Sequence, residues 1–149
     1  MLRTANIVYD ANARPVRRTL ESGSTTHTLA QANYDALGRV NCTAQRMNQA
    51  NFATIIIDAC ELGGSGAQGP DRITQTRYDA AGRADQVKTA VGTGDASNES
   101  TGTFTDNGQL ETLTDAEGNR MREASLSGLV FPQLSGIQEW GIYGGPHIE

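Results

Sequence analysis

The sequence, 149 residues long, is poor in several residue types that mark common functional classes. It has one lysine, and its eleven arginines are scattered singly apart from the pair Arg17-Arg18, so no basic stripe indicates binding of DNA or RNA. No run reaches the roughly 18 apolar residues of a membrane-spanning helix, and the first residues lack the apolar segment of a secretory signal. We therefore expect no nucleic-acid partner and no membrane span. We also expect either a cytosolic chain or a piece of a longer protein whose export signal lies elsewhere.

Cysteine and histidine are scarce as well, with two residues of each. The positions of Cys42, Cys60, His27 and His147 show none of the paired spacing of a zinc site. Two interpretations of the cysteines stay open, namely two buried thiols or a disulfide that pins the chain between them. We predict no catalytic residue, no cofactor-binding residue and no metal ligand.

Large apolar side chains are also few, which limits the core. Leu, Ile, Val and Phe together make up 27 of the 149 residues, slightly below the ~20% at which disorder becomes a concern. The net charge of -5 is too small for repulsion to keep the chain open. Because glycine and threonine, which suit turns and strands, are plentiful, we predict an all-β chain with a thin core.

The most informative stretch is the hexapeptide Tyr-Asp-x-x-Gly-Arg, which occurs at 34–39 and again at 78–83. Asp at the first position and Gly at the fourth favour a type I turn, since Asp can accept backbone hydrogen bonds and Gly adopts the left-handed conformation. Such a turn closes a β-hairpin with a one-residue bulge. The residues that we assign to these structural turns are Tyr34, Asp35, Gly38, Arg39, Tyr78, Asp79, Gly82, Arg83, Gly108, Asp115 and Gly118.

Three of these turns depart from the full pattern. The first, after Tyr9, has Ala13 where the glycine belongs, and Asn12 is the residue there that tolerates the left-handed region. The turn ending at Gly108 has Phe and Thr in place of Tyr and Asp, and the turn from Asp115 to Gly118 lacks the aromatic residue. We also predict that the segment after Pro15 is an edge strand, because proline cannot donate to a β-ladder.

This recurring motif resembles the YD repeat of Rhs-type proteins, the shells of bacterial polymorphic toxins and insecticidal complexes, with teneurins as distant animal relatives. The resemblance covers about residues 5–120. It implies a curved antiparallel β-hairpin sheet that is part of an Rhs-type shell, in a longer secreted or cell-surface bacterial protein that delivers a toxin. The implied function is structural and non-enzymatic, and the implied partners are further YD repeats of the same or a longer chain and an encapsulated toxin cargo.

A carbohydrate-binding or cell-surface-binding repeat module is the alternative, because exposed tyrosines can stack on sugars. The alternation of side chains slips by one position after Tyr78, so the sequence leaves open whether Tyr34 and Tyr78 lie on one face of the sheet.

The chain divides into a YD-repeat hairpin region at 1–120 and a divergent tail at 121–149. A mixed insertion at 46–70 interrupts the repeats, with a short helical turn expected near its start and a glycine-rich loop at its end. In that loop Gly64, Gly66 and Gly69 match the spacing of a dinucleotide-binding loop, but the sequence that follows is β-like and not helical. We expect Gly66 to tolerate a larger side chain better than Gly82, since only Gly82 needs the left-handed conformation.

Overall fold

A computed structural model describes residues 3–54 and 58–122; the apolar run at 55–57, His147 and the tail from 123 to 149 lie outside the described residues. The described chain forms one nine-stranded antiparallel sheet in which every strand pairs with its neighbours in sequence. The prediction of an all-β, curved sheet of hairpins is therefore confirmed. Besides the 3₁₀ turn η1 at Gln49–Asn51, the elements are β1 (Thr4–Tyr9), β2 (Pro15–Ser22), β3 (Thr25–Tyr34), β4 (Val40–Arg46), β5 (Arg72–Tyr78), β6 (Ala84–Thr89), β7 (Ser97–Phe104), β8 (Leu110–Asp115) and β9 (Arg120–Arg122).

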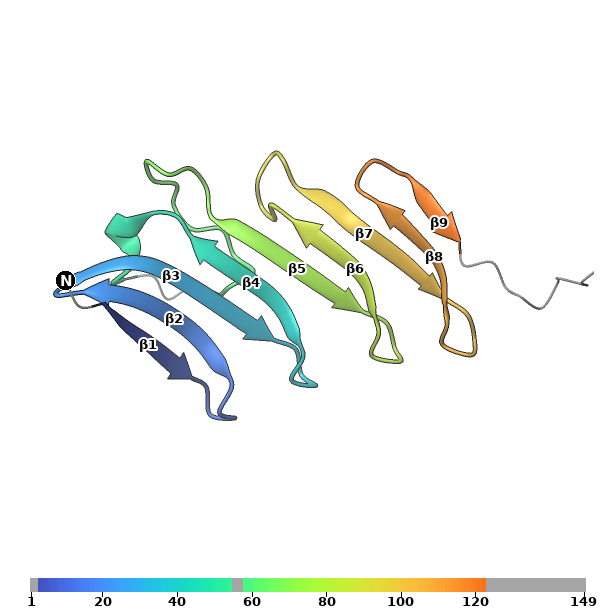
Figure 1. Cartoon of the computed structure of the whole chain (residues 1–149), viewed down its shortest axis with the longest axis horizontal. Helices are drawn as coiled ribbons and strands as arrows, with labels where there is room; N and C mark the ends of the chain where they lie inside the picture. Colours follow the sequence, from blue (N-terminus) through green and yellow to red (C-terminus); the bar gives the residue numbers. More distant parts are fainter. Residues whose placement is uncertain (1–2, 55–57, 123–149) are drawn as a thin grey trace, which may run out of the picture.

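The turns of the repeat lie side by side at one end of the strands, so the edge that they form runs across the strands and differs from the edge strands of the sheet (Figure 1). Because successive strands run in opposite directions, the turns at 10–13, 35–38, 79–82 and 105–108, each of which joins an odd-numbered strand to the next even-numbered one, come to the same edge. The turn from Asp115 to Gly118 joins β8 to β9 and therefore lies at the opposite edge, although its backbone hydrogen bonds match those of the others. The strand β9 that follows it continues to Arg122, two residues into the segment assigned to the tail.

The turns have the geometry that their composition predicts. In the turn after Tyr34, the backbone N–H of Gly38 donates to the carbonyl of Asp35 at 2.9 Å, and the N–H of Asp35 donates to the carbonyl of Arg39 at 2.8 Å. Gly38 has a φ of 81°, and the strand register shifts by one residue between Asn33 and Tyr34, which is the expected bulge.

The first turn differs from the expectation in one respect. Ala13, and not Asn12, adopts the left-handed conformation, with a φ of 59°. The turn hydrogen bonds explain this choice, because the N–H of Ala13 donates to the carbonyl of Asp10 just as the glycine does in the other copies. The backbone geometry of the turn therefore dominates over the intrinsic preference of the residue.

We predict that Ala13→Gly raises the free energy of unfolding by about 0.5 kcal/mol, measured by urea denaturation. Relief of a left-handed alanine gains ~1 to 2 kcal/mol, partly offset by ~0.4 to 1 kcal/mol because glycine makes the unfolded chain more flexible. The control is Ala11→Gly in the same turn, where φ is not positive and only the unfavourable part applies. Equal destabilisation by both changes would contradict the strain at Ala13.

The edge strands of the described sheet are β1 and β9, so the prediction of an edge strand after Pro15 was wrong. Strand β2 lies between β1 and β3. Pro15 is the first residue of β2 and sits opposite Tyr9 at the bulge. A proline at the first position of a strand interrupts few ladder hydrogen bonds, which explains how a central strand accommodates it.

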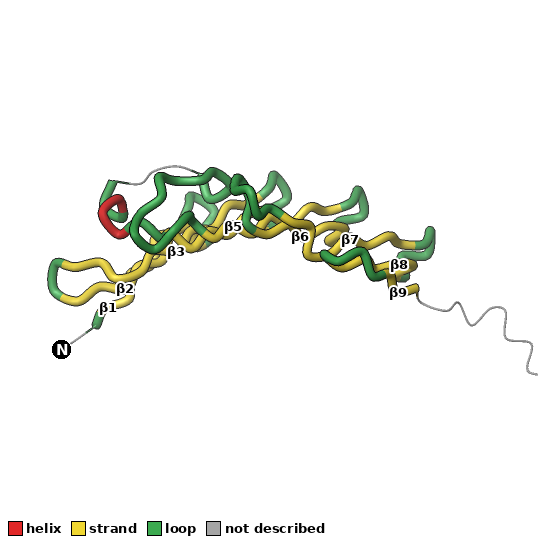
Figure 2. The backbone as a smooth tube through the Cα atoms, turned by 90° about the horizontal axis from the view of Figure 1, so that it is seen from above, coloured by secondary structure: helices red, strands yellow, loops and turns green. Residues whose placement is uncertain are grey.

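The insertion between β4 and β5 covers part of one face of the sheet, over β2 to β5. Figure 2 shows the sheet as an arch with this segment on its outer, convex side. Cys42, Ala44 and Ile73 pack beneath Ala59 of the insertion, and Phe52 and Leu29 are the other buried apolar side chains among the described residues. The core is therefore thin and local, as the small number of large apolar side chains predicts.

The glycine-rich end of the insertion is more constrained than we expected. A Cβ atom at Gly66 would lie 2.9 Å from the side chain of Asn48, whose amide donates to the carbonyls of Gly64 and Ser65. Gly66 pairs with Gly69 in an isolated bridge, and the chain then enters β5, whereas a dinucleotide-binding loop opens a helix. Gly66 is thus a poor control for a substitution at Gly82, because a larger side chain would clash there. Gly94, with open space around it, is a better control.

Candidate functional site

The repeated turn residues form a connected set of interactions along one edge of the sheet. In each full copy, the aspartate Oδ1 atom accepts the backbone N–H of the arginine four residues later, at 2.9 Å for both Asp35 and Asp79. The Oδ2 atom of the same carboxylate accepts the Nε–H of that arginine at 2.7 Å. Asp10 and Arg14 repeat this arrangement. Each arginine is thereby held at a fixed angle to its own turn.

These contacts lower the pKa of the turn carboxylates. The backbone hydrogen bond from Arg39 is the main cause for Asp35, and the matching bonds from Arg14 and Arg83 are the main causes for Asp10 and Asp79. In the turn at the opposite edge, the pKa of Asp115 is lowered chiefly by the side-chain amide of Asn119, which takes the place of the arginine. The ionised aspartate is thus part of the folded turn.

The arginine of one turn stacks on the aromatic ring that precedes the next turn along the edge. The guanidinium carbons of Arg14, Arg39 and Arg83 lie 4.5, 4.2 and 4.4 Å from the ring centroids of Tyr34, Tyr78 and Phe104, respectively. Three equivalent cation–π contacts therefore join four consecutive hairpins of the repeat. We call this set of three arginines and three aromatic rings the ladder.

Two further features support the arginine–aromatic contacts, each of which is one rung of the ladder. The hydroxyl of Tyr34 donates to the carbonyl of Pro15 at 3.0 Å, and that of Tyr78 donates to the carbonyl of Val40 at 2.8 Å, so each tyrosine bonds to the residue after the arginine that covers it. A Cβ atom on Gly82 would lie 3.2 Å from the Nη1 atom of Arg39. The turn glycine thus permits both the left-handed conformation and the close approach of the arginine.

The sheet geometry places the aromatic residues on the uncovered, concave face. Cys42 and Ala44 are buried on the covered face, so Thr43, between them in β4, points the other way. Thr43 pairs with Ala32 and with Thr74, and Tyr34 and Tyr78 lie two and four positions further along those strands. Tyr34 and Tyr78 therefore share one face, because the extra residue at each register shift, Asn41 or Asp85, lies on the strand after the turn and leaves the alternation within β3 and β5 unbroken.

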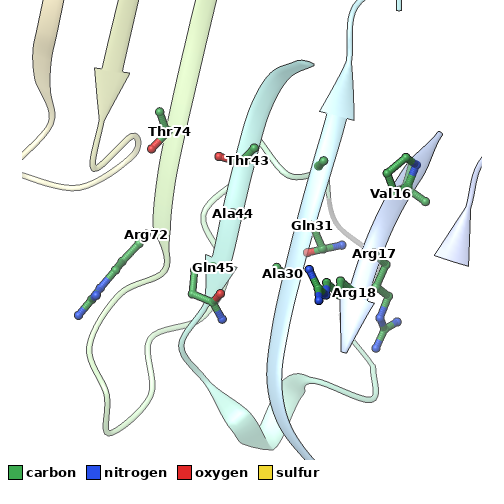
Figure 3. A pocket seen from close by; sticks show the side chains of 12 residues that line it. Val16, Arg17, Arg18, Ala30, Gln31, Thr43, Ala44, Gln45, Arg72 and Thr74 are labelled. Atoms are coloured by element: carbon green, nitrogen blue, oxygen red, sulfur yellow. The ribbon is translucent and has the colours of Figure 1, made fainter. Parts of the chain in front are cut away.

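A shallow hollow occupies the same uncovered face across β2 to β5 (Figure 3). Its volume is about 440 Å³. Small side chains form its floor. The exposed Arg18 of β2 and Arg72 of β5 lie at opposite sides of the hollow, with β3 and β4 between them. The lining contains no cysteine, histidine or carboxylate, so the hollow offers shape and positive charge, and the hydroxyls of Thr43 and Thr74 have no general base beside them in the lining.

A buried ion pair fastens the insertion to the covered face. The side chains of Arg46 and Asp71 are 1% and 2% exposed, and the Arg46 Nη1 atom lies 2.8 Å from Asp71 Oδ2. Arg46 also donates to the carbonyls of Asp58 and Glu61 and to the side chain of Gln31. Asp71 accepts the backbone N–H groups of Met47 and Gly63. Both charges are therefore fully hydrogen-bonded, which is what makes their burial tolerable.

The cysteines form the disulfide that was one of the two interpretations open from the sequence. Cys42 of β4 bonds to Cys60 of the insertion across 18 positions. In the chain-entropy model a link of this length contributes ~3 kcal/mol to stability. Because Cys42 is bonded to Cys60, it is not a free thiolate. The side chain of His27 is exposed to solvent.

The structure thus places the predicted turn residues in two groups. Those of the turns from Tyr34, Tyr78 and Phe104 come together along one edge, whereas Asp115 and Gly118 lie at the other. In the turn before Gly108, the hydroxyl of Thr105 accepts the backbone N–H of Gln109 in place of a carboxylate. Sequence reasoning missed the ladder and the Arg46–Asp71 pair.

The described chain is a sheet of β-hairpin repeats joined by the ladder. No protein-family model matches the chain, and no curated protein does. Within residues 3–54 and 58–122, no three His, Cys, Asp or Glu side chains lie close enough to hold a metal ion. None of the helical segments described is long and apolar enough to cross a membrane.

We predict that Arg39→Gln and Tyr78→Leu are coupled in a double-mutant cycle, with a coupling free energy of about 0.5 to 1 kcal/mol measured by urea denaturation. Each single change removes the same cation–π contact, so the losses do not add. The control cycle combines Tyr78→Leu with Arg120→Gln, a distant and exposed arginine. Equal coupling in both cycles would count against the ladder.

We predict that Asp71→Leu lowers the free energy of unfolding by about 3 to 5 kcal/mol, because it leaves Arg46 buried without its counter-ion. Adding Arg46→Met is expected to recover part of that loss. The matched control is Asp85→Leu, which removes the carboxylate from the largely exposed Arg77 and is expected to cost less than about 1 kcal/mol. Similar losses at Asp71 and Asp85 would show that burial of the pair is unimportant.

We predict that stability falls as the pH falls below the ordinary range of aspartate. The pKa values of Asp10, Asp35 and Asp79 are lower in the folded state, so their contribution is complete above the unfolded value of 3.8 and is lost as the pH falls through the folded values. Urea denaturation between pH 6 and about 2.5 tests this, with Asp35→Asn and Asp79→Asn combined as the variant. A slope as steep in the variant as in the parent would contradict the assignment.

Proposed function

We propose that this chain is a non-enzymatic structural segment of an Rhs-type shell, in a longer bacterial protein that is secreted or displayed at the cell surface. The single observation that carries the proposal is the ladder. The aromatic ring, aspartate, glycine and arginine of the motif are all used to hold one hairpin against the next, which is the role of wall material. The proposed partners are further hairpins of the same kind and a toxin cargo.

The two faces of the sheet differ in a way that suits a wall. The insertion, its disulfide and the Arg46–Asp71 pair cover the convex face, where they brace the curvature. The concave face carries small and polar side chains, including Ala30, Ala32 and Thr43. A wall that encloses another protein needs such an inner face, because large exposed apolar patches would bind the enclosed protein tightly and hinder its release.

The alternative is a module that binds carbohydrate, and the hollow on the concave face is the observation in its favour. A sugar ring normally stacks on a free aromatic face. The rings of Tyr34 and Tyr78 are each covered on one side by an arginine, so they are poorly placed for stacking. Arg18 and Arg72 would instead favour an acidic sugar. We rank this function below the wall because the rings of Tyr34 and Tyr78 are already engaged.

The direct test is electron microscopy of the native protein that contains this segment, purified from its own cells with an antibody fragment against the insertion loop. The wall proposal expects a closed, hollow particle, with the antibody fragment bound to its outer surface. A small open sheet with no enclosed volume, or an antibody fragment bound inside the particle, would overturn the proposal.

A glycan array separates the alternative function from the wall. The proposed wall expects a flat response across neutral and acidic glycans. Saturable binding that is lost in the Arg18→Ala and Arg72→Ala variants, with unchanged thermal stability, would instead establish the hollow as a carbohydrate site.

A further inference from the structure

The ladder has an unfilled position at the β1 edge of the sheet. Tyr9 precedes the first turn just as Tyr34 and Tyr78 precede theirs, but no arginine covers its ring, because no earlier hairpin precedes it in the described structure. Tyr9 is 56% exposed, and its neighbours Ile7 and Val8 are 44% and 52% exposed. The outer side of β1 thus has no partner strand among the described residues, and the strand ends in an uncovered aromatic ring.

The direction of the strands restricts what can fill this position. In each existing arginine–aromatic pair, the arginine directly precedes an even-numbered strand, which leaves a turn and runs antiparallel to the strand beyond it. A partner of β1 must therefore run antiparallel to it and begin with an arginine beside Tyr9. The other free edge, β9, is an odd-numbered strand like β1, so adding it head to tail from a second copy would make a parallel pair that does not continue the meander.

Two other arrangements of copies bring no turn arginine to the ring. Antiparallel pairing of β1 with β1 of a second copy would bring Tyr9 near the partner's Thr4, which Arg3 precedes, but Arg3 does not belong to a turn whose aspartate holds it as Asp10, Asp35 and Asp79 hold theirs. The last turn on the ladder edge offers no cation, since Gln109 stands where Arg14, Arg39 and Arg83 stand in the others. Self-association of the described part of the chain therefore brings no aspartate-held turn arginine to Tyr9.

We propose that the β1 edge is a docking site for a β-hairpin whose turn has the pattern Asp-x-x-Gly-Arg. The outgoing strand of that hairpin pairs antiparallel with Thr4–Tyr9, its arginine stacks on the ring of Tyr9, and the Tyr9 hydroxyl donates to the carbonyl of the residue after that arginine. The inference deepens the proposed function and rests on it, because it specifies which edge accepts a further repeat and which side chain selects it.

The probe is a backbone-cyclised hairpin peptide that copies residues 25–46 with Cys42→Ser, so that it carries the turn of Tyr34 to Arg39 without a thiol. Cyclisation is needed because an isolated two-stranded hairpin is only marginally stable. The matched control peptide carries Arg39→Gln. Binding to the full 149-residue chain is measured by fluorescence anisotropy, and hydrogen exchange locates the protected backbone amides.

We expect the arginine peptide to protect amides of β1, and we expect the glutamine peptide to bind about fivefold more weakly. The Tyr9→Leu protein should lose a similar factor with the arginine peptide and show no difference between the two peptides. The Tyr9→Phe protein keeps the ring and should retain the preference for arginine. This pattern would assign the selectivity to the ring of Tyr9.

Equal binding of the two peptides, unchanged binding by Tyr9→Leu, protection at β9 in place of β1, or no binding would each overturn the inference. The result is distinguishable from a failure of the wall proposal. A closed particle with no selectivity at Tyr9 would leave the wall and remove the docking site. Selective docking in a protein that forms no closed particle would leave the docking site and remove the wall.

Discussion

The structure depends on a guanidinium group that is held on two sides. The aspartate of its own turn fixes it through hydrogen bonds, and the aromatic ring before the next turn on the same edge provides the surface on which it lies. A hairpin on its own is marginally stable in water, since two strands bury little surface. The arginine makes each hairpin a support for the next, so stability comes from the series and not from any single unit.

The insertion solves a different problem. An open sheet of this width has two bare faces, and its sequence has too few large apolar residues to cover either one by packing alone. The chain instead fastens a mostly irregular segment to one face with a disulfide and a buried, fully hydrogen-bonded ion pair. Polar and covalent links thus replace much of the missing hydrophobic core, at the place where the sheet curves.

Much of the fold could be predicted from the sequence because turn chemistry is local. Asp35 and Gly38 fix the turn through hydrogen bonds within five residues, and the strands at Thr25–Tyr34 and Arg72–Tyr78 have the bounds that the turns imply. The position of Ala13 was misjudged because the choice of left-handed residue depends on the hydrogen bonds of the turn and not on residue preference alone.

The ladder and the ion pair are long-range, and this is why sequence reasoning did not find them. The turn alone explains the aspartate and glycine of the motif but gives no reason for its tyrosine and arginine. That unexplained pair was the available signal, since an aromatic residue recurs at a fixed place in four copies and an arginine in three of them. Nothing comparable marks Arg46 and Asp71, which lie 25 positions apart and look like ordinary surface charges in the sequence.

The ladder can be observed directly by the proton chemical shifts of the arginine side chains in solution. A side-chain methylene proton held over an aromatic ring is shifted upfield, whereas that of a solvated arginine keeps its ordinary shift. The account predicts upfield shifts for Arg14, Arg39 and Arg83, and ordinary values for Arg18 and Arg120. Ordinary values for all five arginines would contradict the claim that stacked guanidinium groups join the hairpins.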